Sequence, residues 1–315
     1  MKLIVGHRAC GILFRYISKI GGKWLLPANV CPVVPFTFIE AKIPFEFVDI
    51  DRETYCISEE EVLKKIRSDK TIIGVLFVHT YGCVYDVERF IHKIRDIRTI
   101  KLIDDKCLCR PDLVSQDTLA DVVLYSTGYA KYVDLGKGGY AWLQNSEDLC
   151  REDTIYESDT IEDYYKKLQK TEKLYSPENV PNHWIDTYLE KSEDKIEEYF
   201  KIIQKELPII DEHKKSINNI YNNLLSANNL GEYMNVWRYN LFVDKKEDIL
   251  STIFAAGLYA SSHYYPSSKL FTKKRYPNAE WLYEHIINLF NDKYISINQA
   301  KELSKQLINN INKKI

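Results

Sequence analysis

The run TIIGVLFV, residues 71–78, indicates the fold class of this chain. It is apolar throughout and rich in β-branched residues, the pattern of a strand that is buried on both faces. Strands of this kind lie in parallel sheets that helices cover on both sides. The flanking residues agree, because Ser58 precedes a run of glutamates as a helix N-cap does, and Val87–Ile97 has amphipathic helical spacing.

Strands and helices are predicted to alternate over the first 145 residues. Helical spacing covers Ala9–Ile20, and a second helix is expected to run from Ser58 to about Ile66. Short apolar runs predict the strands Lys2–Val5, Trp24–Leu26, Phe45–Ile50, Ile100–Ile103, Val122–Tyr125 and Gly138–Leu143. We therefore expect an α/β domain with a mostly parallel sheet over residues 1–145.

The pattern changes after this domain. Residues 146–195 are acidic and rich in Tyr, with weak periodicity, whereas residues 196–225 predict one long helix with Pro208 as a kink or break. We interpret residues 146–230 as a connecting region that contains this helix. A smaller α+β domain is expected over residues 231–315. Its predicted elements are a strand over Asn235–Val243, a helix over Lys246–Ala256, a second strand near Tyr264 and two C-terminal helices.

The composition narrows the classes of protein that need to be considered. Hydrophobic residues make up 45% of the chain and charged residues 28%, which is typical of a soluble globular protein. The net charge of −2, with both signs interspersed, argues against a nucleic-acid partner. Charged residues interrupt the N-terminal apolar stretch, so we expect no signal peptide, no membrane span and a cytoplasmic location.

The 7 cysteines are irregularly spaced and are expected to be reduced thiols. Cys107 and Cys109 form a CxC pair, but no second pair of ligands accompanies them, so no metal site is predicted.

Polar side chains follow three predicted strands at the points where the strands end. These are Asp104 with Asp105, Ser126, and the loop His79–Gly82, and Lys131 comes shortly after Ser126. Ligands of open α/β sheets bind outside the C-terminal ends of the strands. A lysine, a carboxylate and a hydroxyl are the groups that pyridoxal 5'-phosphate (PLP) needs for its aldehyde, its ring nitrogen and its phosphate. By itself, this pattern does not distinguish a cofactor site from an ordinary solvated loop.

The order of several motifs resembles the DegT/DnrJ/EryC1/StrS family of sugar aminotransferases, which are fold-type-I PLP-dependent enzymes. The motifs in the first domain are FEFVDIDRETYCISEEEVLKKI (45–66), VLFVHTYGCVYDVERF (75–90), LIDDKC (102–107) and LYSTGYAKYVDLGKGGYAWL (124–143). HYYPSSKLF (263–271) and PNAEWLYEHIINLF (277–290) resemble a loop and a helix of the same family. The resemblance implies a large PLP-binding domain followed by a small C-terminal domain.

The resemblance also implies roles for individual residues. Lys131 would be the Schiff-base lysine, Asp105 would pair with the pyridinium nitrogen of PLP, and Ser126 would bind its phosphate. The turn Gly6-His7-Arg8 would add backbone amides to the phosphate site, where Arg8 offers a charge-assisted bond. Cys31 occupies the position where the family has an aromatic ring that stacks on the cofactor. His263 and Tyr264 would lie near the sugar, and His79 is either a substrate contact or a packed loop residue.

The implied function is transfer of an amino group, expected from glutamate, to a nucleotide-linked keto sugar in surface-polysaccharide or related sugar biosynthesis. Lys131 also argues against the dehydratase branch of the family, which has histidine at this position. By analogy, we expect a homodimer. Two positions depart from the pattern of the family: Cys31 replaces the stacking ring, and Leu108 stands where the family usually has a Gln or His that bonds the cofactor hydroxyl. They favour the alternative of a catalytically weak or inactive PLP-fold partner or regulatory protein. A third interpretation is a different α/β enzyme whose ligand carries a phosphate.

Overall fold

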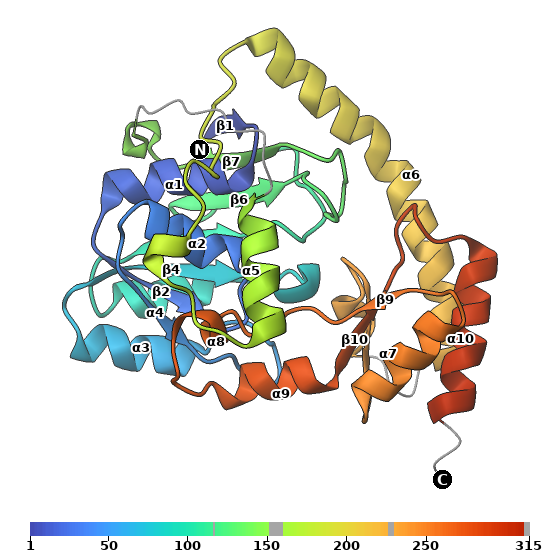
Figure 1. Ribbon diagram of the computed structural model, residues 1–315. Helices are drawn as coiled ribbons and strands as arrows, with labels where there is room; N and C mark the ends of the chain where they lie inside the picture. The colour runs from blue at the N-terminus through green and yellow to red at the C-terminus, as the bar shows by residue number, and fades with distance from the viewer. Residues whose placement is uncertain (116, 151–159, 226–229, 312–315) are drawn as a thin grey trace.

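The computed structural model describes residues 1–115, 117–150, 160–225 and 230–311. Seven strands form one large sheet in the order β1-β7-β6-β5-β4-β2-β3 (Figure 1). β7 is antiparallel to its neighbours β1 and β6, and the remaining pairs are parallel. This mostly parallel sheet confirms the predicted fold class. The strands are β1 Lys2–Gly6, β2 Lys23–Pro27, β3 Phe45–Val48, β4 Ile72–Val78, β5 Lys101–Asp105, β6 Val122–Ser126 and β7 Gly139–Leu143.

Helices cover both faces of the large sheet. α1 (Ala9–Ile20) and α2 (Val33–Glu40) contribute to one core, and α3 (Glu59–Ser68) and α4 (Glu88–Arg95) contribute to the other. Alternate side chains of each strand enter alternate cores, as the pleat requires. On β5, Leu102 belongs to the core with α3 and α4, whereas Ile103 belongs to the core with α1. This two-sided burial explains the uninterrupted apolar run of β4.

A second, smaller sheet has the order β8-β10-β9, with antiparallel pairing throughout. Its strands are β8 Tyr239–Phe242, β9 Ala260–Ser261 and β10 Ile286–Leu289, and α7 (Lys246–Ala255) and α10 (Ile297–Ile311) supply side chains to its core. The long helix α6 (Glu193–Leu225) runs from the large sheet to this small domain (Figure 1). Its Ile203 is buried in the core of α3 and α4, and its Ile217 is buried in the core of the small domain.

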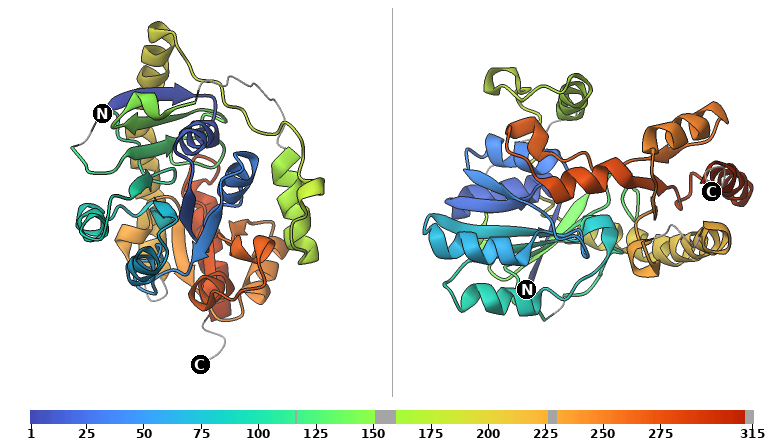
Figure 2. Two further views of the ribbon diagram at one scale, coloured as in Figure 1. Left: turned by 90° about the vertical axis from the view of Figure 1, so that its left-hand side faces the viewer. Right: turned by 90° about the horizontal axis from the view of Figure 1, so that it is seen from below.

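The structure differs from the sequence-based predictions in several elements. The helix α2 was not predicted, and the strand expected near Tyr264 lies earlier, as β9. α6 continues through Pro208, which lies between the buried Leu207 and Ile217 that fix the helix in two cores. The helix α5 (Thr160–Thr171) was not predicted, and it packs outside α2 with α8 (Ser268–Phe271) (Figure 2). The predicted helix over residues 277–290 ends at His285 as α9 (Pro277–His285). The next four residues form β10, which pairs with β8 on one side and β9 on the other.

The part of the chain that the structure describes lacks two features. None of its helices is long and apolar enough to cross a membrane. Its His, Cys, Asp and Glu side chains form no group of three or more that could hold a metal ion.

Candidate active site

The parallel strands β4, β5 and β6 end side by side, and their last residues carry the predicted polar groups. Asp105 ends β5 beside Val78 of β4, and Ser126 ends β6. Asp105 and Ser126 share the face of Ile103 and Leu124, which is the face covered by α1 and α2. Asp104 has the opposite parity and faces the other core. The pleat therefore separates the two adjacent aspartates and brings Asp105 to the same face as Ser126.

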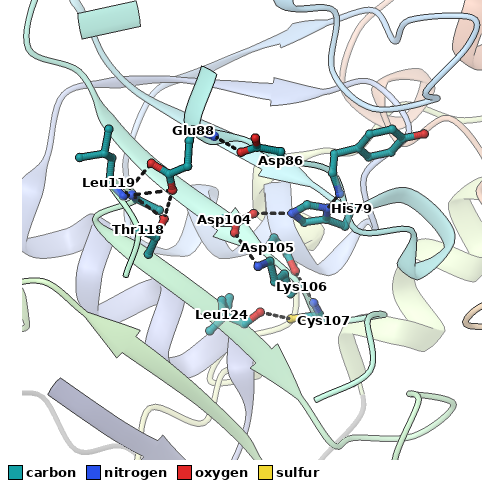
Figure 3. Close-up of polar contacts among 12 residues, drawn as sticks. His79, Asp86, Glu88, Asp104, Asp105, Lys106, Cys107, Thr118, Leu119 and Leu124 are labelled. Carbon is teal, nitrogen blue, oxygen red and sulfur yellow. Dashed lines mark hydrogen bonds and ion pairs between the residues drawn. The ribbon is translucent and has the colours of Figure 1, made fainter. Parts of the chain in front are cut away.

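Asp105 is a buried carboxylate, 6% exposed, with little internal compensation. The backbone N–H of Cys107 donates to its Oδ1 at 2.9 Å (Figure 3), and no ion pair joins it to any residue that the structure describes. Burial raises the pKa of Asp105, and the hydrogen bonds from Cys107 and the ammonium of Lys131 lower it in part. Such a carboxylate is suited to hold a cationic partner.

Lys131 lies in a loop whose backbone is tightly held. Ser126 Oγ accepts a hydrogen bond from the Gly128 N–H at 3.3 Å, and the Lys131 N–H donates to the carbonyl of Gly128 at 3.3 Å. Ala130 has a φ of 56°, a left-handed conformation that is costly for alanine. The indole N–H of Trp237 donates to the Ala130 carbonyl at 2.6 Å and so supports this conformation.

The Lys131 ammonium makes no hydrogen bond or ion pair with any residue of the described ranges. Its charge nevertheless lowers the pKa of Asp105 and of Cys31, and both of these pKa values are raised mainly by burial. An amine that has no partner in the described part of the chain therefore lies within electrostatic range of a buried carboxylate.

The N-terminus of α1 lies at the same edge of the sheet. Gly139 of β7 pairs with Gly6 on one side and with Ser126 on the other, so the predicted phosphate-binding groups flank a single residue. A Cβ at Gly139 would lie 2.6 Å from the backbone nitrogen of Ala9, so only glycine permits this approach. The residue before the helix, Arg8, provides no side-chain cap. Helix N-termini of this kind bind anions.

His7 contributes its backbone to this turn, whereas its ring turns away. Its carbonyl accepts a hydrogen bond from the Gly138 N–H at 2.6 Å. Its Nδ1 lies 3.0 Å from Asp186 Oδ2, and its ring packs on Tyr188 with centroids 4.4 Å apart. The turn is thus fixed from both sides.

A loop of the small domain completes the surroundings of Lys131. Burial raises the pKa of Tyr264 well above its usual value, and the charges of Cys31 and Asp105 raise it further, which places Tyr264 near both groups. Tyr81 donates a hydrogen bond from its hydroxyl to the carbonyl of His263 at 2.5 Å. The rings of Tyr81, His263 and Tyr264 lie nearly parallel to Trp237, at centroid distances of 6.5, 5.4 and 6.2 Å.

His79 lies on the opposite face, and its surroundings do not support the predicted substrate contact. Its side chain is fully buried, and Nε2 donates to Asp104 Oδ1 at 2.6 Å (Figure 3). Nδ1 lies 3.0 Å from the Cys83 carbonyl and 3.1 Å from the Tyr85 N–H. The second oxygen of Asp104 pairs with Lys106 at 3.3 Å. Both nitrogens of the ring are therefore engaged within the protein.

Trp237 is a residue of this site that no motif in the sequence identifies. It is far from Ala130 in the chain, and no local pattern connects the two.

The donor set of the site fits PLP. It offers an amine with no hydrogen bond or ion pair to any described residue, a buried carboxylate at a strand end, a hydroxyl and a helix N-terminus, which are the kinds of group that the aldehyde, ring nitrogen and phosphate require. The resemblance assigns the stacking position to Cys31, which has a thiol in place of an aromatic ring, and Leu108 is buried in the core at 5% exposure. These two side chains are less suited to a cofactor than those that the resemblance leads us to expect.

The fold is the fold-type-I arrangement expected from the sequence, and the donor set contains the kinds of group that PLP requires. Residues 40–169 match the model of the DegT/DnrJ/EryC1/StrS aminotransferase family. This match confirms the resemblance predicted from the motifs and relates the chain to that family through most of its large domain. No curated protein matches the sequence.

Solved structures share the fold over nearly the whole chain. A protein from Streptococcus pneumoniae that is designated a sugar aminotransferase, in its PMP form, has a TM-score of 0.75 at 16% identity and covers 100% of this chain and 89% of its own. A DegT/DnrJ/EryC1/StrS aminotransferase from Brucella abortus has a TM-score of 0.71 at 14% identity, with coverages of 99% and 86%. The E. coli GDP-4-keto-6-deoxy-D-mannose-3-dehydratase with bound hydrated PLP has a TM-score of 0.67 at 15% identity, with coverages of 98% and 87%.

Proposed function

We propose that this chain is a PLP-dependent sugar aminotransferase with Lys131 as its catalytic residue. The observation that carries the proposal is the ammonium of Lys131, which has no hydrogen bond or ion pair among the described residues and lies within electrostatic range of the buried Asp105. The amino donor is an amino acid, with glutamate as the expected one. The acceptor is the keto group of a nucleotide-linked sugar.

When bound, PLP would supply an aldehyde that takes up amino groups and a ring that withdraws electrons from the neighbouring carbon. The residues of the chain have separate tasks around it. Asp105 holds the ring nitrogen in its protonated form, because a buried carboxylate is stabilised by a cationic partner. Ser126 and the N-terminus of α1, preceded by Gly6, His7 and Arg8, hold the phosphate. Lys131 removes a proton from the substrate carbon and returns it as general base and acid.

The similarity to sugar aminotransferases supports a sugar as the acceptor. Among the structural neighbours, the E. coli dehydratase is named for a GDP-linked keto sugar. Lys131 favours amino transfer over dehydration in this chain. His263 and Tyr264 are proposed as sugar contacts because the small-domain loop brings both to the Lys131 side of the sheet. We further propose a cytoplasmic homodimer that serves surface-polysaccharide or related biosynthesis, and a mass measurement in solution tests the dimer.

A covalent adduct tests the proposal directly. The purified protein is incubated with PLP, reduced with borohydride and digested, and the peptide that contains Lys131 is weighed. We expect a PLP adduct on Lys131 that is absent in Lys131→Ala. Lys137→Ala is the matched control, because Lys137 lies exposed in the same loop. An adduct spread over surface lysines, or none at all, would overturn the assignment.

The inactive alternative is favoured by Cys31 and Leu108, which leave the stacking and hydroxyl contacts of the cofactor unfilled. It predicts that the adduct on Lys131 forms but that glutamate does not convert the bound cofactor to its amino form. Following the absorbance of the loaded protein after addition of glutamate separates the two functions.

A further inference from the structure

Arg238 is a buried cation of the small domain. It lies immediately before β8 and is 4% exposed. No ion pair joins it to a carboxylate within the part of the chain that the structure describes. Asp292 is the carboxylate whose charge acts on it, without reaching ion-pair distance. A buried guanidinium without a paired carboxylate is costly unless something else compensates it.

The protein compensates Arg238 only in part. The guanidinium lies over the ring of Trp237 at 4.4 Å and over the ring of Phe290 at 4.0 Å, and one of its NH groups donates to Ser261 Oγ. Its Nε is buried and has no hydrogen-bond partner among the residues that the structure describes. The two rings stack on the faces of the guanidinium and do not bond the N–H groups at its edge. A carboxylate can accept two parallel hydrogen bonds from such an edge.

The position of Arg238 connects it to the candidate active site. Its stacking partner Trp237 also bonds the carbonyl of Ala130, the residue before Lys131. Burial lowers the pKa of His263 to about 3, and the charges of Arg238 and Lys131 both contribute. The charge of Arg238 also acts on Tyr264. Arg238 is therefore a second cation on the Lys131 side of the sheet.

The segment that carries Arg238 is fixed before any ligand binds. Lys214 of α6 is buried, and its ammonium donates to the carbonyl of Trp237 at 2.7 Å and to Asn291 Oδ1 at 2.7 Å. These bonds occupy the Lys214 ammonium within the protein. A site with rigid supports binds its ligand with a lower entropic cost.

We propose that Arg238 binds a carboxylate of the amino-acid donor and so aligns the donor with Lys131. This inference rests on the proposed function, because it assumes that an amino acid reacts at Lys131. One deeply buried guanidinium offers one positive charge, which matches a carboxylate. The diphosphate of a nucleotide-linked sugar carries more charge and needs several donors.

The test measures binding of glutarate, an unreactive analogue of glutamate, to the PLP-loaded protein by calorimetry. We expect Arg238→Gln to weaken glutarate binding about 10- to 100-fold, the loss that corresponds to a charge-assisted contact. Arg52→Gln is the matched control, because Arg52 also stacks on a tryptophan, Trp281 at 3.6 Å, but is exposed. Arg52→Gln should bind glutarate like the wild type.

A second probe, inorganic pyrophosphate, distinguishes the two anionic substrates. The inference is overturned if Arg238→Gln binds glutarate normally, or if it loses pyrophosphate and retains glutarate. Arg238→Lys keeps the charge without the planar edge and should bind glutarate several-fold more weakly. If Arg238→Gln does not fold, Arg238→Lys provides the test. Wild-type affinity of Arg238→Lys for glutarate then overturns the proposal.

The adduct on Lys131 is measured in the same samples to separate the inference from the proposed function. A normal adduct with glutarate binding that is insensitive to Arg238 means that only the inference fails. Absence of the adduct in the wild type means that the proposed function fails, whatever happens at Arg238.

Discussion

Asp104 and Asp105 are adjacent in the chain and end the same strand, yet their surroundings are opposite. Asp104 belongs to a closed buried group in which His79 and Lys106 use both of its oxygens. Asp105 has one backbone hydrogen bond and no ion pair within the described residues, and it faces Lys131. The comparison shows that at a strand end the pleat decides which aspartate is structural and which is open to a ligand.

The two histidines repeat this contrast. Both ring nitrogens of His79 have protein partners. The ring nitrogens of His263 make no hydrogen bond with the residues that the structure describes, although its backbone is held by Tyr81 and Asn288. In these two pairs, the polar atoms of Asp104 and His79 have partners within the protein, whereas Asp105 and the His263 ring retain polar atoms without partners among the described residues.

The largest effect on stability is expected from a substitution in the buried group of Asp104, His79 and Lys106. Asp104→Leu removes the partner of Lys106 and of the His79 N–H, so the free energy of unfolding should fall by about 3–5 kcal/mol. Urea unfolding of the cofactor-free protein, followed by circular dichroism, measures this change. Lys106 is 9% exposed, so its unpaired ammonium should account for much of the loss.

The double variant Asp104→Leu/Lys106→Met provides the control for this explanation. Removing the unpaired Lys106 ammonium should restore part of the lost stability. Replacing both members of a buried ion pair by apolar side chains costs far less free energy than removing only one member. If the double variant is less stable than Asp104→Leu alone, the unpaired charge is not the cause.

The neighbouring aspartate should respond in the opposite way. Asp105→Asn keeps an oxygen for the Cys107 N–H, so its unfolding free energy should change by less than about 1 kcal/mol. Its affinity for PLP should fall about 10- to 100-fold, because a neutral amide cannot compensate the protonated ring nitrogen. Equilibrium titration with PLP measures the affinity. A variant that is destabilised like Asp104→Leu but binds PLP normally would contradict the comparison.

The pH dependence of stability should report His263. Its pKa in the folded protein is lowered to about 3, mainly by burial, whereas an unfolded histidine titrates near 6.5. Between these two values only the unfolded chain binds the proton, so lowering the pH below about 6.5 destabilises the fold. The contribution of His263 at pH 5 is at most about 2 kcal/mol.

Thermal unfolding from pH 8 to pH 5 measures this slope, which should be shallower in His263→Gln. His92→Gln is the control, because His92 is exposed on α4 and should leave the slope unchanged. An identical slope in wild type and His263→Gln would show that the ring stays accessible to protons in the folded protein.

Local signals in the sequence predict the large domain well. The apolar run of β4 and the Ser58 cap, whose Oγ accepts from the Glu61 N–H at 3.3 Å, are properties of neighbouring residues. The edge that joins Asp105, Ser126 and Lys131 follows because parallel strands end on the same side of their sheet.

The parts that failed depend on contacts between distant residues. The β10 residues continue the helical spacing of α9, and only pairing with β8 and β9 makes them a strand. His79 follows Phe77 by two residues, so it faces the same core as Phe77. Which core that is depends on the position of β4 in the sheet. Arg238 comes to the Lys131 side of the sheet only when the small domain packs there, so no local motif could have identified it.

The smallest effect is expected for Trp237, whose ring lies beside His263 next to the candidate site. Trp237→Phe keeps a ring against His263 but removes the bond to the Ala130 carbonyl, which supports the left-handed backbone before Lys131. Loss of one such bond should lower the unfolding free energy by about 0.5–1.5 kcal/mol. Trp184→Phe is the matched control, because Trp184 is equally buried and its indole N–H has no partner to lose. If the Trp237 bond positions Lys131, Trp237→Phe alone should also slow adduct formation with PLP by a few-fold. Equal rates in the two variants would mean that Trp237 stabilises the interface between the domains without positioning the lysine.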